Sequence, residues 1–235
     1  MGGTAFITFA AENRYNSKVW MNMKKTVALF DLDGVIFDTE TQYSVFWGEI
    51  GRREHPEVEH FDRVIKGQTL VQIYGKWFAG QDDLQQRITK ELDEFEKHMN
   101  YEYMPGVERF LQELRANGVH TAVVTSSNDV KMRNVYKVHP EFSGYFDEIL
   151  TSERFRRSKP APDCYLLGAE VFGADTADCV VFEDSFHGLE AGRGAGMKVV
   201  GLSTTNAAER IAPMCDCVIP DFTAFGIENL KDLLA

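Results

Sequence analysis

Short apolar runs and amphipathic segments alternate along most of the chain. Thr26 to Phe30 is an apolar run that ends at Asp31, a pattern typical of a buried strand. The same signals predict strands at 121–125, 147–151, 178–182, 198–202 and 217–219, and helices at 107–117, 163–172 and 227–234. Strands that alternate with helices in this way predict an α/β fold, in which helices cover both faces of a parallel sheet.

One helical block interrupts this alternation directly after the first strand. Residues 40–103 have a helical pattern, which includes a charged amphipathic stretch from Asp82 to about Asn100. Met104-Pro105-Gly106 then breaks the chain. We therefore expect a helical domain over 39–104, inserted into a core made of 23–38 and 105–235. The junctions near residues 38–40 and 104–106 are candidate hinges.

The first 22 residues stand apart from both of these parts. Their mildly apolar stretch, Ala5 to Ala11, has no basic residue before it, which is a poor fit to a secretory signal. Met21 and Met23 come just before the first strand, and translation from either is an alternative to a start at Met1. We expect residues 1–22 to be a dispensable, poorly ordered extension.

Charge and cysteine content narrow the class of protein. The 235 residues carry a formal net charge of −11, and no apolar run reaches the length of a membrane span. A chain without a net positive field does not attract nucleic acid or anionic membranes, so we expect neither as a partner. The four cysteines form no CxxC pair and no zinc-type cluster with histidine, which favours reduced thiols in a cytoplasmic protein.

Polar side chains follow the predicted strands. Ligands of an open parallel sheet bind outside the carboxyl ends of its strands. The segments found there are Asp31-Leu-Asp-Gly34, Thr125-Ser-Ser-Asn128, Lys159-Pro-Ala-Pro-Asp163 and Glu183-Asp-Ser185. Carboxylates, hydroxyls and a lysine should thus converge at one edge of the sheet. These groups suit phosphoryl transfer, in which positioning and charge neutralisation do most of the work.

These four segments, in this order, resemble the four motifs of the haloacid dehalogenase superfamily. The likeness runs from about Val27 to Ile219, and Asp31-Leu-Asp-Gly-Val-Ile-Phe-Asp38 is a specific signal by itself. It is closest to the subgroup of phosphoglycolate phosphatases, sugar-phosphate phosphatases and β-phosphoglucomutases. The resemblance implies a Rossmann-like core of three layers with an inserted helical cap.

The resemblance also implies catalytic roles. Asp31 resembles the nucleophile that forms an aspartyl phosphate, and Asp33 resembles the general acid/base. Residues i and i+2 of a strand share a face, so both carboxylates can point at one site. Thr125 and the backbone N–H of Ser126 resemble the phosphate-binding groups, while Lys159 resembles the lysine that neutralises the phosphate and the nucleophile. A helix cap at Thr125 and a surface loop at Lys159 are the structural alternatives.

A metal site follows from the same resemblance. Asp184 resembles the metal-binding acid, and Glu183 beside it is a second ligand or an outer partner. An oxygen-only site made of Asp31, the Asp33 backbone carbonyl, Asp184 and waters fits Mg²⁺. Such an ion would offset charge on the transferring oxygens.

The predicted cap supplies the candidate substrate contacts. Lys66-Gly67-Gln68-Thr69 falls where relatives place cap residues that reach into the site. We expect Lys66 or Lys76 to touch the leaving group, and the alternative is that both lysines are exposed.

The leading interpretation is a Mg²⁺-dependent phosphatase that acts on a small phosphorylated metabolite, as a monomer or weak homodimer. A phosphomutase and an inorganic pyrophosphatase are alternatives. Related mutases use a histidine on the first cap helix, where this chain has Tyr43, and a cap arginine, where it has Leu70 or its neighbours. A non-catalytic regulator is disfavoured, because every motif position is filled.

Overall fold

The computed structural model describes residues 25–66 and 68–235. The expected extension at residues 1–22 lies outside the described residues, as does Gly67. Within them, six parallel strands form one sheet in the order β3-β2-β1-β4-β5-β6. The strands are β1 (Val27–Phe30), β2 (His120–Val124), β3 (Glu148–Leu150), β4 (Cys179–Glu183), β5 (Lys198–Leu202) and β6 (Cys217–Ile219).

Strand β1 lies at the centre of the sheet, between β2 and β4. Its four residues are apolar and fully buried, as expected of a parallel strand covered on both faces. Phe30 stacks on Phe182 of β4, with ring centroids 4.5 Å apart. Asp31 comes directly after Phe30, so the chain leaves the sheet between the ends of its two neighbours. This position fixes where the candidate chemistry takes place.

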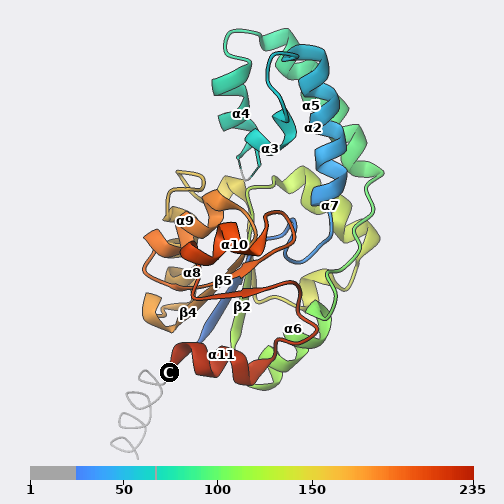
Figure 1. Ribbon diagram of the computed structural model, residues 1–235. Helices are drawn as coiled ribbons and strands as arrows, with labels where there is room; N and C mark the ends of the chain where they lie inside the picture. The colour runs from blue at the N-terminus through green and yellow to red at the C-terminus, as the bar shows by residue number, and fades with distance from the viewer. Residues whose placement is uncertain (1–24, 67) are drawn as a thin grey trace, which may run out of the picture.

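Helices cover both faces of the sheet (Figure 1). Helices α6 (Val107–Ala116), α7 (Asp129–Val138) and α11 (Ile227–Leu234) contribute to the apolar cluster on one face. Helices α8 (Asp163–Phe172), α9 (Phe186–Gly194) and α10 (Ala208–Ile211) contribute to the cluster on the other. Four short 3₁₀ segments complete the core, namely η1 (Phe142–Gly144), η2 (Ser152–Arg154), η3 (Thr176–Asp178) and η4 (Ala212–Met214). The predicted three-layer α/β fold is therefore confirmed.

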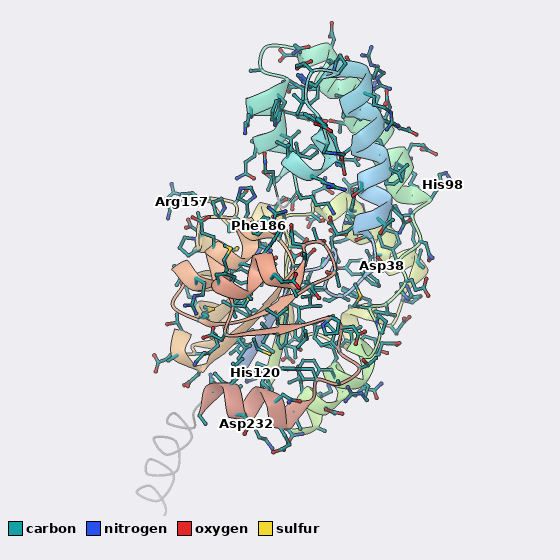
Figure 2. All side chains as sticks on the ribbon, in the orientation of Figure 1. Asp38, His98, His120, Arg157, Phe186 and Asp232 are labelled. Atoms are coloured by element: carbon teal, nitrogen blue, oxygen red, sulfur yellow. The ribbon has the colours of Figure 1, made fainter. Side chains whose placement is uncertain are left out.

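The remaining helices form a cap beyond the carboxyl edge of the sheet (Figure 1). They are α2 (Glu40–Glu54), α3 (Phe61–Val64), α4 (Leu70–Trp77) and α5 (Asp82–Lys97). The cap has its own apolar cluster, in which Ile50, Phe78 and Ile88 are almost fully buried. Side chains fill its interior as they fill the core (Figure 2). The cap therefore has an apolar core of its own.

Two antiparallel connections join the cap to the core. The Asp38 N–H donates to the Glu102 carbonyl at 2.9 Å, and the Met104 N–H donates to the Ile36 carbonyl at 2.8 Å. Asp38 lies where the chain passes from core to cap (Figure 2). These two connections lie at the junctions named from the sequence. The hinge and the domain boundaries at 39 and 104 stay predictions.

Gly106 ends the second connection and offers a test of the fold. Its φ is +80°, and an added Cβ would lie 2.7 Å from the Phe222 backbone carbon. Gly118 has a similar φ of +69°, but its Cβ would meet nothing within 4 Å. We expect Gly118→Ala to lower the free energy of unfolding by about 1 kcal/mol, from the left-handed conformation alone. Gly106→Ala should cost roughly 3 kcal/mol, because backbone must also shift. Equal losses in urea unfolding would refute the steric argument.

Element boundaries differ slightly from the predicted ones. The charged cap helix ends at Lys97 rather than near Asn100, and β2 and β4 are each displaced by one residue. Helix α7, between β2 and β3, had not been identified from the pattern. Its buried side includes Lys131 and Asn134, which obscure the apolar stripe.

Candidate active site

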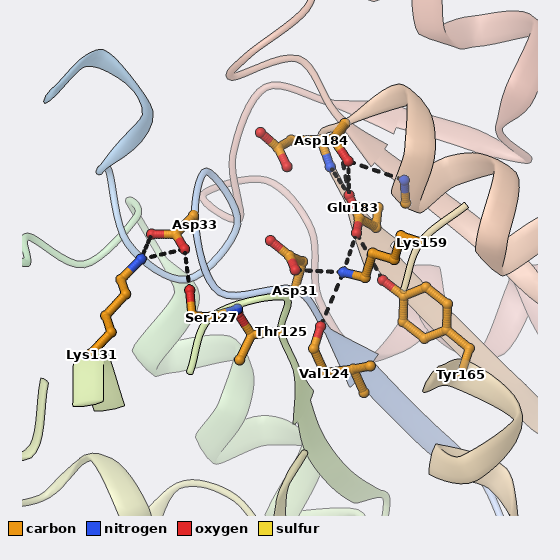
Figure 3. Close-up of polar contacts among 12 residues, drawn as sticks. Asp31, Asp33, Val124, Thr125, Ser127, Lys131, Lys159, Tyr165, Glu183 and Asp184 are labelled. Carbon is orange, nitrogen blue, oxygen red and sulfur yellow. Dashed lines mark hydrogen bonds and ion pairs between the residues drawn. The ribbon is translucent and has the colours of Figure 1, made fainter. Parts of the chain in front are cut away.

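The centre of the site is an ion pair at the end of β1. The Lys159 ammonium lies 2.5 Å from an Asp31 carboxylate oxygen and donates to the Val124 carbonyl at 3.1 Å (Figure 3). Burial raises the pKa of Asp31 from 3.8 to about 7, although Lys159 opposes the rise. Burial alone would lower the pKa of Lys159, but Asp31 and Glu183 outweigh it and hold that pKa well above its usual value. Lys159 is therefore a fixed cation.

Glu183 holds this lysine from the other side. Its Oε1 lies 2.6 Å from the Lys159 ammonium and accepts a hydrogen bond from the Tyr165 hydroxyl at 2.9 Å. Its Oε2 accepts from the N–H groups of Asp184 and Ser185 and from the Ser185 hydroxyl. Both oxygens of this fully buried carboxylate are thus engaged by protein donors. Glu183 is arranged to position Lys159 and the loop after β4.

Asp184 faces the Asp31-Gly34 loop across the same site. Gly34 has a φ of +75°, and an added Cβ would lie 2.2 Å from an Asp184 carboxylate oxygen, so only glycine fits there. The Thr205 hydroxyl donates to the same carboxylate. Burial, followed by repulsion from Glu40, Glu183 and Asp31, raises the pKa of Asp184 well above its usual value. A cation bound beside Asp184 would therefore relieve this repulsion.

The donor set at this point fits a hard divalent cation. Asp31, Glu183 and Asp184 each offer a carboxylate oxygen, and these oxygens all lie within 4.8 Å of one another. Lys159 is shared by the first two, and Asp184 hydrogen-bonds to a neutral threonine. Buried carboxylates that outnumber the cations paired with them are costly unless a metal or protons compensate. The oxygen-only chemistry matches Mg²⁺ better than Zn²⁺.

Asp33 points to the opposite side of the site from Lys159 (Figure 3). The Lys131 ammonium contacts both of its carboxylate oxygens, one of them at 2.5 Å. The Thr39 hydroxyl donates to it at 2.5 Å, and the Ser127 hydroxyl donates at 3.1 Å. The two aspartates of the first segment thus have separate cationic partners.

The loop after β2 lines the site with hydroxyl groups. Thr125 is buried, and its hydroxyl accepts a hydrogen bond from the Ser127 N–H at 3.0 Å. The Ser126 hydroxyl is buried without a hydrogen-bond partner among the described residues. Buried polar groups are almost always paired, so this hydroxyl in the cavity wall is available to hydrogen-bond a molecule in the cavity. Thr125 and Ser126 lie where a phosphate-binding loop was expected.

A cavity of about 650 Å³ extends from this site to the underside of the cap. Its core residues include Asp31, Asp33, Thr125, Ser126, Lys159, Glu183 and Asp184. Its cap residues include Trp47, Lys66, Thr69 and Gln72. The Gln72 amide donates to the Lys159 carbonyl at 2.9 Å, so the cap and the core already touch over the site. The cavity is large enough for a small metabolite.

Comparison with known proteins places the chain in a family. A model of the haloacid dehalogenase-like hydrolases matches residues 28–202. The chain belongs to this family. Hexitol phosphatase A of Escherichia coli is 30% identical over 190 residues, which cover 78% of this chain and 85% of that protein. The Drosophila melanogaster protein named "Probable pseudouridine-5'-phosphatase" is 31% identical over 217 residues, covering 82% and 91% respectively.

Solved structures agree on the haloacid dehalogenase-like fold. β-Phosphoglucomutase from Clostridium difficile superposes with a TM-score of 0.75 at 20% identity, over 89% of this chain and 97% of that one. The chain is thus a haloacid dehalogenase-like phosphohydrolase of the branch that carries a helical cap. In the described ranges, no helix is both long and apolar enough to cross a lipid bilayer.

The cap residues expected to contact the substrate differ in where they lie in this haloacid dehalogenase-like hydrolase. Lys66 lines the cavity and pairs with Glu40 at 3.0 Å. Gly67 lies outside the described residues. Lys76 does not fit the expectation: it is exposed, its ammonium stacks over the Trp77 ring at 5.0 Å, and it does not line the cavity. The N-cap residue of helix α4, Thr69, lines the cavity, and Lys76 lies almost two turns further along the helix.

Several site residues were not identified from the sequence. Tyr165, Thr205 and Gln72 lie outside the motif segments, and no local pattern marks them. Lys131 did carry a signal, because it lies on the buried side of helix α7 next to Met132. A lysine on the apolar side of an amphipathic helix requires a buried partner, which Asp33 supplies.

Proposed function

We propose that this protein is a Mg²⁺-dependent phosphatase that hydrolyses a small phosphomonoester, such as a sugar or polyol phosphate, through an aspartyl phosphate on Asp31. The observation that carries the proposal is the Asp31 carboxylate, held 2.5 Å from the buried Lys159 ammonium beside Asp184 and at the inner end of the cavity. The names of the phosphatase relatives support the substrate class.

The first step uses both aspartates. A carboxylate oxygen of Asp31 attacks the phosphorus, and the bond between phosphorus and the leaving oxygen breaks. Asp33 donates a proton to that leaving oxygen, so the product departs as a neutral alcohol. Lys159 offsets the negative charge that accumulates when a phosphate approaches a carboxylate. The Thr125 and Ser126 groups hold the non-bridging oxygens.

The second step regenerates the enzyme. Asp33, now ionised, removes a proton from a water molecule that attacks the phosphorus of the aspartyl phosphate. The bond between phosphorus and the Asp31 oxygen breaks, inorganic phosphate leaves, and Asp31 returns to its carboxylate form. The hydrogen bond from Gln72 to the Lys159 carbonyl would help to keep the cap closed, so that other water molecules are excluded from the site.

Asp31, Asp184 and the Asp33 backbone carbonyl would hold the metal ion. When bound, the ion supplies positive charge that stabilises the transferring phosphoryl oxygens. We propose that Glu183 acts outside the coordination sphere, because both of its oxygens already accept protein hydrogen bonds. Its task would be to orient Lys159.

The contacts of Tyr43 favour a phosphatase over a mutase. Its hydroxyl donates to Glu96 at 2.8 Å, and its ring covers the Lys131 ammonium. A mutase must grip a second phosphate through its cap. Tyr43 occupies the position of the histidine of related mutases, and here it is committed to an internal carboxylate instead.

A panel of phosphorylated metabolites tests the proposal. Purified protein with Mg²⁺ should release inorganic phosphate from at least one sugar or polyol phosphate, and EDTA should stop the release. A coupled assay with β-glucose 1-phosphate and its bisphosphate activator should give no glucose 6-phosphate. Mutase turnover that exceeds hydrolysis, or no turnover on any ester, would overturn the proposal.

Mg²⁺ binding should strengthen as the pH rises. The Asp31 pKa of about 7 lies above the unfolded value of 3.8, so the metal-free folded protein favours the protonated carboxyl. Ionisation of Asp31 therefore lowers the free energy of unfolding of the metal-free protein as the pH rises through 7. Bound Mg²⁺ should offset this loss. We expect the Mg²⁺-induced rise in Tm to be larger at pH 8 than at pH 6. Calorimetric titrations at both values should show about tenfold tighter binding at pH 8, and equal affinities would contradict the assignment.

Lys66 is proposed as a cap contact to the leaving group. Lys66→Ala should raise KM by about 3- to 10-fold and change kcat little, since a group that binds substrate and transition state alike affects mainly KM. The matched control is Lys90→Ala, which makes the same change at an exposed position of cap helix α5. Steady-state kinetics on the preferred ester decide the matter, and an unchanged KM would remove Lys66 from the site.

A further inference from the structure

Lys131 is a buried ammonium that the proposed reaction does not use. It is 1% exposed, and it lies on core helix α7 rather than in any of the four catalytic segments. Its ammonium contacts both carboxylate oxygens of Asp33, 98 residues away along the chain. A lysine buried to this degree requires a compensating partner, and here that partner is the proposed general acid/base.

The opposite side of this ammonium belongs to the cap. The Tyr43 ring of helix α2 covers it, with the ammonium 4.5 Å from the ring centroid. The Tyr43 hydroxyl donates to Glu96 of helix α5, a carboxylate that is 6% exposed. Burial raises the pKa of Glu96, and attraction to Lys131 opposes that rise, so the two charges act on each other. Lys131 thus lies between the acid/base of the core and two side chains of the cap.

We propose that Lys131 is a positioning residue for Asp33 and that it couples Asp33 to the cap through Tyr43. The proposal rests on the phosphatase function proposed above. Asp33 is also held by the hydroxyls of Thr39 and Ser127. Of these three donors, only the ammonium reaches both of its oxygens, and so it fixes the plane of the carboxylate.

The contact between Tyr43 and Lys131 links the position of the cap to Asp33. Helices α2 and α5 move with the cap, whereas Lys131 and Asp33 belong to the core. Movement of the cap changes the distance from the Tyr43 ring to the Lys131 ammonium. It therefore also changes how firmly the ammonium fixes the Asp33 carboxylate. Proton donation to the leaving group is therefore tied to the position of the cap over the substrate.

Leaving-group dependence tests this role. An aryl ester such as p-nitrophenyl phosphate releases a stable anion and needs little proton donation, whereas an alkyl phosphate needs a proton on its leaving oxygen. Lys131→Met keeps most of the side-chain length and removes the charge. We expect kcat/KM to fall by about 10- to 100-fold for the best alkyl ester of the substrate panel, and by less than about 3-fold for p-nitrophenyl phosphate.

The matched control is Lys137→Met, which makes the same change at an exposed position of helix α7. It should leave both values of kcat/KM unchanged. Equal losses on the two esters in Lys131→Met, no loss, or a gain would overturn the positioning role. Absence of turnover in the unaltered protein would instead overturn the proposed function, so the two failures are distinguishable.

A pair of Tyr43 variants tests the cap connection without removing the buried charge. Tyr43→Phe and Tyr43→Leu both lose the hydroxyl that contacts Glu96, but only the second loses the aromatic face over Lys131. Relative to Tyr43→Phe, we expect Tyr43→Leu to lower kcat/KM for the alkyl ester by about 2- to 10-fold more than for the aryl ester. Identical ratios in the two variants would refute the coupling, and this test holds even if Lys131→Met does not fold.

Discussion

Asp31→Asn is expected to reduce phosphate release by about 10⁴-fold or more. The amide oxygen is a poor nucleophile, and removal of the attacking group leaves only the binding and electrostatic parts of the site. The side chain keeps its size, so the variant should fold and its Tm should change little. Transfer of ³²P from a labelled ester to the protein should occur in the parent enzyme and vanish in the variant.

Asp38→Asn is the matched control for this change. Asp38 belongs to the same segment, but it is exposed at the connection between core and cap. Its replacement should leave kcat within about 2-fold of the parent value, as for other surface changes. Substantial turnover by Asp31→Asn, with acid-labile phosphate still attached to the protein, would mean that another side chain is the nucleophile.

Lys159→Met is expected to impair both catalysis and stability. Lys159 is 1% exposed and is the ammonium that contacts Asp31 and Glu183, so its loss leaves two carboxylates without their cation. We expect kcat/KM to fall by about 10³-fold, because the lysine no longer offsets the repulsion between the Asp31 carboxylate and the approaching phosphate. The free energy of unfolding in EDTA should fall by about 3 kcal/mol at pH 8.

The pH dependence of that loss gives a second check. Without the lysine, the folded pKa of Asp31 rises further above its unfolded value, so the loss of stability applies mainly above the parent pKa of about 7. The destabilisation should therefore be smaller at pH 5.5 than at pH 8 in urea unfolding. Lys198→Met, at the exposed start of β5, is the control and should show neither effect.

Comparison with Glu183→Gln separates the two roles considered for Glu183. A glutamine can still accept the Tyr165 hydrogen bond but loses the charge that holds Lys159. If Glu183 positions the lysine, kcat should fall by about 10-fold with Mg²⁺ affinity unchanged. A loss of Mg²⁺ affinity without a loss of stability would return Glu183 to the list of metal ligands.

The catalytic edge of the sheet was predictable because it depends on local patterns. Apolar runs that end in Asp31, Thr125 and Glu183 mark strands whose carboxyl ends share one edge, and the structure brings these residues together around one cavity. The cap lysines were less predictable. Lys66 and Lys76 are equally plausible from their spacing, and only the direction of helix α4 separates the one that lines the cavity from the one that is exposed.

The sequence by itself determined the α/β class, the inserted helices, and the acids, hydroxyls and lysine of the catalytic segments, because periodicity and motif spacing are properties of neighbouring residues. The pairing of Lys159 with Asp31 was expected from the motifs, but the tertiary structure alone decided the other charge pairings of the site. Lys131 reaches Asp33 across 98 residues, and Glu183 turns toward Lys159 and Tyr165, because burial forces each ionised group to find a partner wherever the packed helices bring one. No local pattern encodes those pairings, since they depend on how the cap and both helical layers meet at the end of β1.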